Sequence, residues 1–341
     1  MQDKTGSQAL KTLALRAFQN AKNDRMNKSK CRVCGSTHTV KNGVRKGVQT
    51  YLCKECGYQF RNDRLPDGER LWQMYQDRKQ TISELAKEFG TSASTIKRRL
   101  RNVTITWTQP NISGEGFVHL DATYWGRNNG VMVAIDSETG VVLYLAFIKH
   151  ECSADYQSAV RSIENRGYKV KGIIIDGMKC LFSLFSRHKV QMCMFHLQMI
   201  VRRYLTQNPR LLAARTLKSL IGRITTMNKD EFLSEYERWK TDWKDTLERR
   251  TRLENGKTRY RHRRLRSARN SIDFYLPYLF TFQEDDCVGM PNTNNKIEGT
   301  FTDLKKNLNN HSGMSEENRQ RFISGFFLAL NSALSKEKAE S

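Results

Sequence analysis

The spacing of apolar and polar positions divides the chain into a front part of short elements, a middle part rich in strands and a long helical end. In the front part, residues 67–79 and 81–102 have helical spacing, and Gly90 interrupts the second stretch. A glycine break between two short amphipathic segments is typical of a helix-turn-helix, whose second helix lies on DNA. The alternative is an ordinary αα-hairpin with a solvated basic face. The cations that would face a duplex are Lys97, Arg98, Arg99 and Arg101.

In the middle part, strand patterns alternate with helical patterns. The elements expected there are three strands, a helix, a buried parallel strand, a helix, a strand and a further helix, at residues 116–123, 131–136, 141–150, 153–166, 171–176, 178–187, 190–194 and from 197. The order β-β-β-α-β-α-β-α predicts a mixed sheet covered by helices, which is the order of ribonuclease-H-like folds.

The last part of the chain is predicted to be helical throughout. Residues 210–290 have helical patterns, and a final helical region runs from Asn295 to about residue 335. Trp239 and Trp243 lie one helical turn apart. Core packing is the favoured interpretation of this pair, and stacking on an extruded DNA base is the alternative.

Four of the eight cysteines follow the pattern C-x2-C-x18-C-x2-C. Each pair can form a knuckle that directs two thiolates at one ion, and two knuckles complete a closed, structural site. Between the pairs we expect short strands with turns at Asn42-Gly43 and Lys46-Gly47. Two disulfides are the alternative, but the sequence has no leader pattern and no apolar run of 18 residues, so neither secretion nor a membrane partner is expected. The predicted zinc ribbon binds one structural Zn²⁺ through Cys31, Cys34, Cys53 and Cys56.

Composition adds a strong excess of positive charge. The chain has 58 Lys+Arg against 35 Asp+Glu, a formal net charge of +23, and residues 1–105 carry +13 of it. Such a surplus favours a polyanionic partner, because Lys and Arg neutralise phosphates and release counterions. A second basic run, residues 249–269, contains ten Lys+Arg and is predicted to contact the DNA backbone rather than only solvent. Its candidate contacts are Arg259, Arg261, Arg263 and Arg264.

Three acids are candidates for holding divalent ions. Asp121 is expected to end the first strand of the middle part and Asp176 to end the buried parallel strand, and ligands gather where parallel strands end. For both, the alternative is a helix cap. Glu298 lies 122 positions after Asp176, and its alternative is a capping box with Asn295. Other acids that could replace Glu298 are Glu284, Asp285, Asp286 and Asp303.

Cys193 and His196 form a C-x-x-H motif where the strand at 190–194 turns into a helix. The pair could be half of a zinc site, although the sequence offers no evident second half. Cys193 is otherwise a core residue. His196 could contact a scissile phosphate or order one of the acids, and His119 could have a supporting role.

In combination, Asp121 in HLDAT, Asp176 in IIIDG, CMFH at 193–196 and Glu298 in NTNNKIEG resemble the DDE transposases of bacterial insertion sequences. The likeness is greatest to the group related to the Mutator-like elements and covers about residues 30–310. It implies a ribonuclease-H-like catalytic core with an all-helical insertion before the glutamate. It also implies that the zinc ribbon and the helix-turn-helix form a DNA-binding front.

The resemblance further implies an activity. Such an enzyme binds the terminal inverted repeats of its element, cleaves a strand and transfers it to target DNA. Two Mg²⁺ (or Mn²⁺) ions would be held by Asp121, Asp176 and Glu298, with His196 in the catalytic set. A homodimer or higher oligomer in a bacterial cytoplasm, associated with the nucleoid, is expected. The alternatives are a DNA-binding regulator without catalysis and a Mg²⁺-dependent nuclease or resolvase with the same core.

The expected fold class is therefore α/β, with a ribonuclease-H-like mixed-sheet core and an all-α insertion. The expected domains are a helical segment at 1–28, the zinc ribbon at 29–62, the helix-turn-helix at 67–103, the first part of the core at 114–210, the helical insertion at 211–290 and the last part of the core at 291–336.

Overall fold

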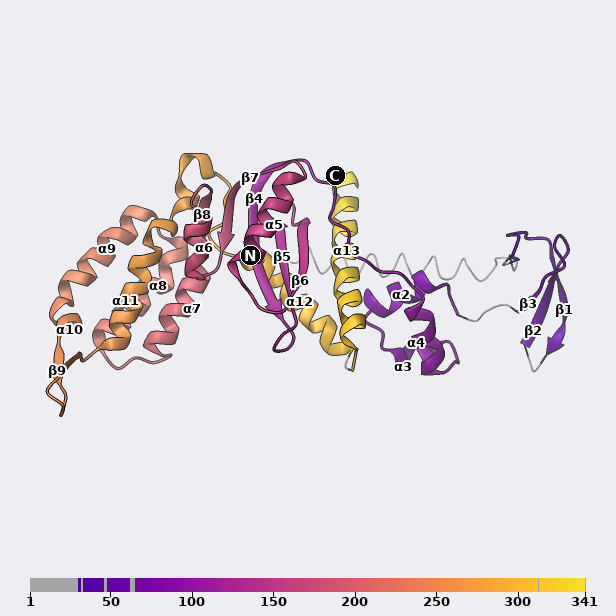
Figure 1. Cartoon of the computed structure of the whole chain (residues 1–341), viewed down its shortest axis with the longest axis horizontal. Coiled ribbons are helices and arrows are strands. Elements are labelled where there is room, and N and C mark those ends of the chain that lie inside the picture. The colour runs from indigo at the N-terminus through magenta and orange to yellow at the C-terminus, as the bar shows by residue number, and fades with distance from the viewer. Residues whose placement is uncertain (1–29, 32, 46–47, 62–64, 312, 341) are drawn as a thin grey trace. The chain divides into compact units, whose positions relative to one another are not determined.

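The computed structural model describes residues 30–31, 33–45, 48–61, 65–311 and 313–340 (Figure 1). The helix expected at 1–28 lies outside these residues. Contacts group the chain into two compact units. The front unit comprises Met1–Leu71 and Ala86–Leu100, and the main unit comprises Trp72–Leu85 and Arg101–Ser341.

A small antiparallel sheet, in the order β1-β2-β3, lies in the front unit. Its strands are β1 (Thr39–Arg45), β2 (Val48–Cys53) and β3 (Gln59–Arg61). The turn expected at Asn42-Gly43 is wrong. The residues form an irregularity inside β1 instead, where Gly43 adopts a φ of 72° and the pairing register with β2 shifts. A glycine in that conformation is typical of a β-bulge.

The next three helices have the order that the sequence predicts: α2 (Gly68–Gln76), α3 (Ile82–Glu88) and α4 (Ala93–Arg101). The α3 helix begins with a reciprocal capping arrangement, in which the Thr81 N–H donates to the Glu84 carboxylate at 2.7 Å and the Glu84 N–H donates to the Thr81 hydroxyl at 3.2 Å. Gly90, with a φ of 58°, forms the turn after α3. The Ser92 hydroxyl accepts the Thr95 N–H at 3.2 Å at the start of α4.

A five-stranded mixed sheet forms the centre of the main unit. Its strands are β4 (Gly114–Tyr124), β5 (Gly130–Asp136), β6 (Val142–Ile148), β7 (Tyr168–Ile175) and β8 (Lys189–Met192). The spatial order is β6-β5-β4-β7-β8. The pairs β4–β5 and β5–β6 are antiparallel, whereas β4–β7 and β7–β8 are parallel. The expected α/β class with a mixed sheet is confirmed.

Helices cover both faces of this sheet (Figure 1). Val118 and Leu120 of β4 pack in one cluster with Tyr156 of α5 (Ser153–Asn165). On the other face, Val133 of β5 packs with Ile297 of α12. The helices on that face are α12 (Asn295–Asn310) and α13 (Glu316–Glu340). Residues paired directly across two neighbouring strands share one face of the sheet, so Asp121, which pairs with Val133, points toward the α12 side.

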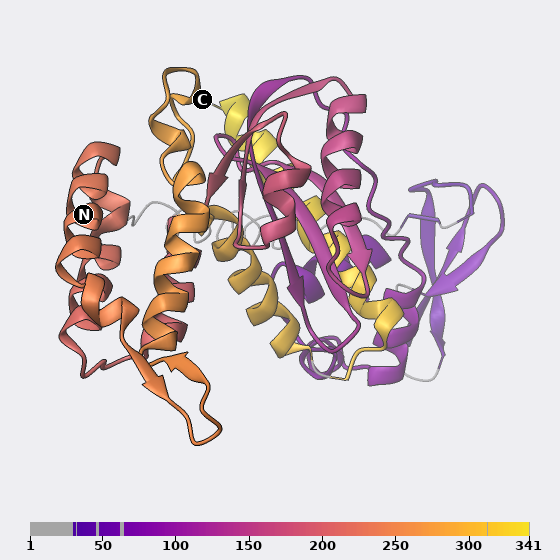
Figure 2. The same ribbon diagram turned by 60° about the vertical axis from the view of Figure 1, so that its left-hand side comes forward.

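The segment between β8 and α12 forms a group of helices beside the sheet (Figure 2). Its helices are α7 (Met194–Leu205), α8 (Leu212–Arg223), α9 (Lys229–Asp242), α10 (Lys244–Glu248) and α11 (Arg263–Tyr275). The short helix α6 (Lys179–Leu184) precedes β8. The expectation of unbroken helix at 210–290 is wrong in one place. Strands β9 (Arg250–Arg252) and β10 (Thr258–Tyr260) pair as an antiparallel hairpin. Asn255-Gly256, with a positive φ at the glycine, supplies the turn.

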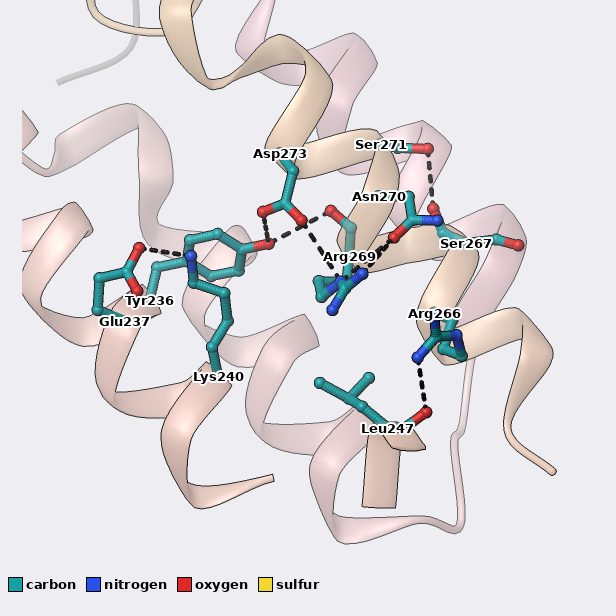
Figure 3. Close-up of polar contacts among 10 residues, drawn as sticks. All are labelled: Tyr236, Glu237, Lys240, Leu247, Arg266, Ser267, Arg269, Asn270, Ser271 and Asp273. Carbon is teal, nitrogen blue, oxygen red and sulfur yellow. Dashed lines mark hydrogen bonds and ion pairs between the residues drawn. The ribbon is translucent and has the colours of Figure 1, made fainter. Parts of the chain in front are cut away.

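Polar contacts join α9 and α10 to α11 (Figure 3). The Tyr236 hydroxyl donates to Asp273 at 2.7 Å, and the Arg266 guanidinium donates to the Leu247 carbonyl at 2.9 Å. Trp239 is buried, and its indole N–H donates to the Ala213 carbonyl at 3.0 Å. The Trp239 indole therefore packs in the core, which is the favoured interpretation, and its rings have no exposed face on which a DNA base could stack. Within the described residues, no helix combines the length and the apolar character needed to cross a bilayer.

Candidate active site

Asp121 and Asp176 are brought together by the register of two neighbouring parallel strands. The pairing of β4 with β7 places His119 beside Ile174. Continued by two residues, this register brings Asp121 level with Asp176, the residue that directly follows β7. Neighbouring strands lie about 4.8 Å apart, so the two carboxyl groups start from adjacent backbone positions. The expectation that Asp121 ends its strand is wrong, because β4 continues to Tyr124.

Cys193 extends this row to a third strand. The pairing of β7 with β8 places Ile175 beside Met192, and the next residues are Asp176 and Cys193. The Cys193 N–H donates to the Ile175 carbonyl at 2.9 Å, which continues the sheet by one bond. The edge of the sheet therefore carries two carboxyl groups and a thiol side by side.

The side chain of Asp176 also has a local structural role. Its carboxylate accepts the N–H of Met178 at 3.1 Å, and Met178 is the N-cap residue of α6. This contact forms a turn before α6 and is not a helix cap, because α6 has no side-chain capping bond. Within the described part of the chain, Asp121 accepts only the N–H of the following residue, Ala122, at 2.8 Å. No helix begins there, so the cap alternative is wrong for Asp121.

Glu298 approaches the same corner from the first turn of α12. The capping box with Asn295 does not form, because Asn294 is the N-cap residue and has no side-chain capping bond. Glu298 faces His196 instead, with 3.5 Å between the carboxylate Oε1 and the imidazole Nδ1. Three of the alternative acids are paired with lysines, namely Glu284 and Asp286 with Lys189 and Asp303 with Lys306.

Electrostatics link these acids. Burial raises the pKa of Asp121 to about 8, with a further contribution from the charge of Asp176 and smaller ones from Glu151 and Glu298. Within the described residues, no ion pair joins Asp121, Asp176 or Glu151 to a lysine or arginine. Acids grouped without a cationic neighbour are costly to ionise, and a bound cation would remove that cost.

The three predicted acids do not form one tight ligand set. Among the described residues, the groups whose ligand atoms all lie within 4.8 Å of one another do not include Asp121, Asp176 and Glu298 together.

Glu151 is a fourth acid that the sequence patterns do not reveal. It follows the edge strand β6, and the buried Tyr156 donates its hydroxyl to the Glu151 carboxylate. Burial and the charge of Asp176 raise the pKa of Glu151. The only signal in the sequence is an acid five residues before a tyrosine on the buried face of a helix.

Buried polar contacts hold the corner in place. His119 is buried, which lowers its pKa, and its Nδ1 lies 2.7 Å from the Asn294 side-chain oxygen. A neutral imidazole that donates from Nδ1 satisfies this contact. The Asn294 N–H in turn donates to the Cys193 sulfur at 3.2 Å. His119 therefore supports the site by connecting β4 to the start of α12.

Tyr275 of α11 connects the helical insertion to Gly177, the residue that follows Asp176. Its hydroxyl donates to the carbonyl of Gly177 at 2.5 Å. A Cβ atom at Gly177 would lie 2.7 Å from Cδ1 of Ile200 and 3.1 Å from the Tyr275 hydroxyl. A glycine thus allows α7 and α11 to approach the turn that carries Asp176.

A second candidate site lies in the front unit. The sulfur atoms of Cys31, Cys34, Cys53 and Cys56 all lie within 4.8 Å of one another, and this set could bind zinc. Each pair is followed by a glycine with a φ of 71°, Gly35 or Gly57, whose N–H donates to the carbonyl of the first cysteine at 3.0 Å. The two knuckles thus have the same backbone geometry.

The predicted DNA-contacting cations are mostly on the surface. On α4, Lys97, Arg98 and Arg101 are exposed and Arg99 is half-buried. Near the β9–β10 hairpin, all four candidates are exposed: Arg259, Arg261, Arg263 and Arg264. Arg264 also donates to the Arg203 carbonyl at 2.7 Å.

Comparisons with known proteins assign no family. No family description matches the chain, and no curated protein matches it. One similar solved chain belongs to the cryo-EM structure of the simian T-cell lymphotropic virus intasome in complex with PP2A regulatory subunit B56 gamma. The match has a TM-score of 0.20 and 14% identity, and it covers 46% of this chain and 69% of that one. A TM-score this low does not establish a shared fold.

Proposed function

We propose that this protein is a DDE transposase, which cleaves DNA at the ends of its element and joins them to target DNA. The observation that carries the proposal is the gathering of three acids: Asp121 lies on β4, Asp176 directly follows the parallel neighbour β7, and the charges of Asp176 and of Glu298 on α12 both act on Asp121. The sequence separates Asp176 from Glu298 by the helical insertion, and the resemblance to this family predicts such an insertion there.

The strand order supports the proposal. An order of β6-β5-β4-β7-β8, with antiparallel pairs on one side of β4 and parallel pairs on the other, is the order of a ribonuclease-H-like core. The expected boundaries of core, insertion, ribbon and helix-turn-helix remain part of this proposal.

The residues fit divalent cations. Asp121, Asp176 and Glu298 offer carboxylate oxygens, the ligands that Mg²⁺ prefers, and none of them is neutralised by a lysine or arginine in the described part of the chain. Two such ions would supply charge neutralisation at the phosphate and activation of the attacking oxygen.

The chain itself would orient the reacting groups. The sheet fixes Asp121 and Asp176 in register, and the contact of Asn294 with Cys193 fixes the start of α12. His196 lies beside Glu298, where it can orient the carboxylate or donate to a phosphate oxygen. The exposed arginines near the β9–β10 hairpin and the cations of α4 would hold the DNA backbone.

The test is a joining assay with the purified full chain, Mg²⁺ or Mn²⁺, labelled DNA from the ends of the element and an unlabelled target. The expected result is a nick at each end followed by covalent joining, and both steps should fall at least 100-fold in Asp121→Asn and in Asp176→Asn. Asp303→Asn, an exposed acid paired with Lys306, is the matched control and should join normally.

The alternatives give different results in the same assay. Cutting without joining indicates a nuclease or resolvase. Binding without cutting indicates a regulator. Joining that survives both aspartate substitutions contradicts the catalytic assignment.

A further inference from the structure

Three side chains of different types that can bind a metal ion lie close together in the main unit. A ligand atom of Cys193, one of His196 and one of Glu298 all lie within 4.8 Å of one another. The sequence offers only the Cys193–His196 half of such a site, and the structure supplies Glu298 from a helix about 100 residues later.

Two of these side chains have buried polar atoms without a partner. His196 Nδ1 and Glu298 Oε1 are both shielded from solvent, and neither has a hydrogen-bond partner. They lie 3.5 Å apart without hydrogen-bond geometry. The side-chain nitrogen of fully buried Asn294 is likewise unpartnered at this corner. Buried polar atoms are normally paired, so this gathering indicates that a ligand belongs between them.

The backbone holds the ligands in place before any ion binds. Cys193 is the N-cap residue of α7, and Glu298 lies in the first turn of α12. Two hydrogen bonds join these helix starts, from the Met194 N–H to the Asn292 carbonyl at 3.0 Å and from the Asn294 N–H to the Cys193 sulfur at 3.2 Å. The site therefore rests on two long helices rather than on loops.

The ligand types select the kind of ion. A thiolate and an imidazole favour zinc over magnesium, and three protein ligands leave one position of a tetrahedral ion open. A cysteine binds a metal ion as the thiolate, so the Cys193 thiol would release its proton to solvent when the ion binds.

A second group of possible metal ligands in the main unit differs because a lysine already neutralises it. Glu284, Asp286 and Cys287 also lie within 4.8 Å of one another. The ammonium of Lys189 lies 2.5 Å from Glu284 and 3.1 Å from Asp286, so a side chain already neutralises that group. The Cys193 group has no such cation among the ion pairs of the described residues.

We propose that Cys193, His196 and Glu298 bind one Zn²⁺ ion, with water or a substrate oxygen as the fourth ligand. The ion would connect the starts of α7 and α12 and fix the carboxylate of Glu298. The second oxygen of that carboxylate would stay free to bind a divalent cation held by Asp121 and Asp176. The proposal goes beyond the transposase function and does not depend on it, since zinc binding is measured without DNA.

The test is the zinc content of the purified full chain after dialysis against excess Mg²⁺ and buffered Zn²⁺. Wild type should hold about two zinc ions per chain, one in the ribbon and one here. Cys193→Ser and His196→Gln should each hold about one. Two matched controls should retain the wild-type content: Cys180→Ser, an exposed free thiol, and His188→Gln, whose imidazole pairs with Glu164 at 3.0 Å.

A spectroscopic measurement separates this site from the ribbon. In the background Cys31→Ser/Cys34→Ser/Cys53→Ser/Cys56→Ser, which removes all four ribbon thiols, added Co²⁺ should give a sulfur-to-cobalt charge-transfer band that disappears with Cys193→Ser. If Cys193→Ser fails to fold, His196→Gln, which changes a half-buried side chain, carries the test. Wild-type zinc content in a folded His196→Gln protein, or a cobalt band that survives Cys193→Ser, overturns the proposal.

Discussion

Asp121 has a strongly raised pKa because its carboxyl group is buried next to other acids. Burial and three neighbouring acids raise its pKa to about 8, whereas an unfolded chain leaves an aspartate near 3.9. The folded state therefore keeps a proton that the unfolded state releases between these values. Without a bound cation, stability should fall as the pH rises from about 4 through about 8.

Asp121→Asn should remove this dependence. We expect the zinc-loaded variant without added Mg²⁺ to melt at least a few degrees above wild type at pH 8, since each kcal/mol shifts the melting temperature of a chain this size by about 2–4 °C. The difference should shrink at pH 5. Thermal melts from pH 5 to 8 measure it, with Asp303→Asn as a control that follows wild type. Parallel wild-type and Asp121→Asn curves over this range would show that Asp121 keeps an ordinary pKa.

The sequence predicts some of these residues and not others. Asp121 and Asp176 are visible because each lies at or near the end of an apolar strand, where a polar residue breaks the pattern. Glu151 is invisible because it follows an edge strand, and only its contact with Tyr156 and the charge of Asp176 connect it to the site. The role of Asn294 depends on contacts with His119 and Cys193, more than 100 residues earlier in the chain.

At the level of elements, local patterns predict most helices and strands because each follows from spacing over a few residues. The β9–β10 hairpin is the exception. Its strands contain only three residues each, and nearly all of these residues are polar and exposed, so no alternation of polar and apolar positions marks them as strands. The Asn255-Gly256 pair between the two strands is the feature of the sequence that indicates a hairpin turn.

The hairpin and the start of α11 present arginines whose loss should change how DNA binding depends on salt. We expect the triple variant Arg259→Ala/Arg261→Ala/Arg263→Ala to weaken binding to DNA of any sequence. The slope of log affinity against log salt should fall by about one for each phosphate contact removed. Fluorescence anisotropy at several salt concentrations measures the slope. Arg238→Ala, an exposed arginine beside Asp242, is the control, and an unchanged slope in the triple variant would rule out a DNA contact here.

At the scale of the whole molecule, the proposed zinc ribbon and the mixed sheet have separate cores. Cys31, Cys53 and Phe60 form a small cluster in the front unit, while the sheet has its own clusters in the main unit. A closed zinc site made of four thiolates contributes directly to the folding of a domain this small. Loss of zinc there should therefore unfold the ribbon and leave the sheet intact.

Cys31→Ser should accordingly lose the ribbon zinc and bind the ends of the element at least tenfold more weakly. The thermal transition of the main unit should remain within about 2 °C of wild type, because no side chain of that unit changes. Metal analysis and calorimetry of the full chain test both parts. Cys152→Ser, an exposed cysteine of the main unit, is the control. Retention of both zinc ions in Cys31→Ser would contradict the ribbon assignment.

The most direct measurement is Mn²⁺ binding to the zinc-loaded full chain by titration calorimetry, because it tests the proposed cation site without any knowledge of the DNA ends. Wild type should bind Mn²⁺, and Asp121→Asn and Asp176→Asn should each weaken binding at least tenfold, a loss of roughly 1.4 kcal/mol or more. Asp303→Asn should bind as wild type does. Equal Mn²⁺ affinity in wild type and both aspartate variants would contradict the central claim that these acids form a divalent cation site.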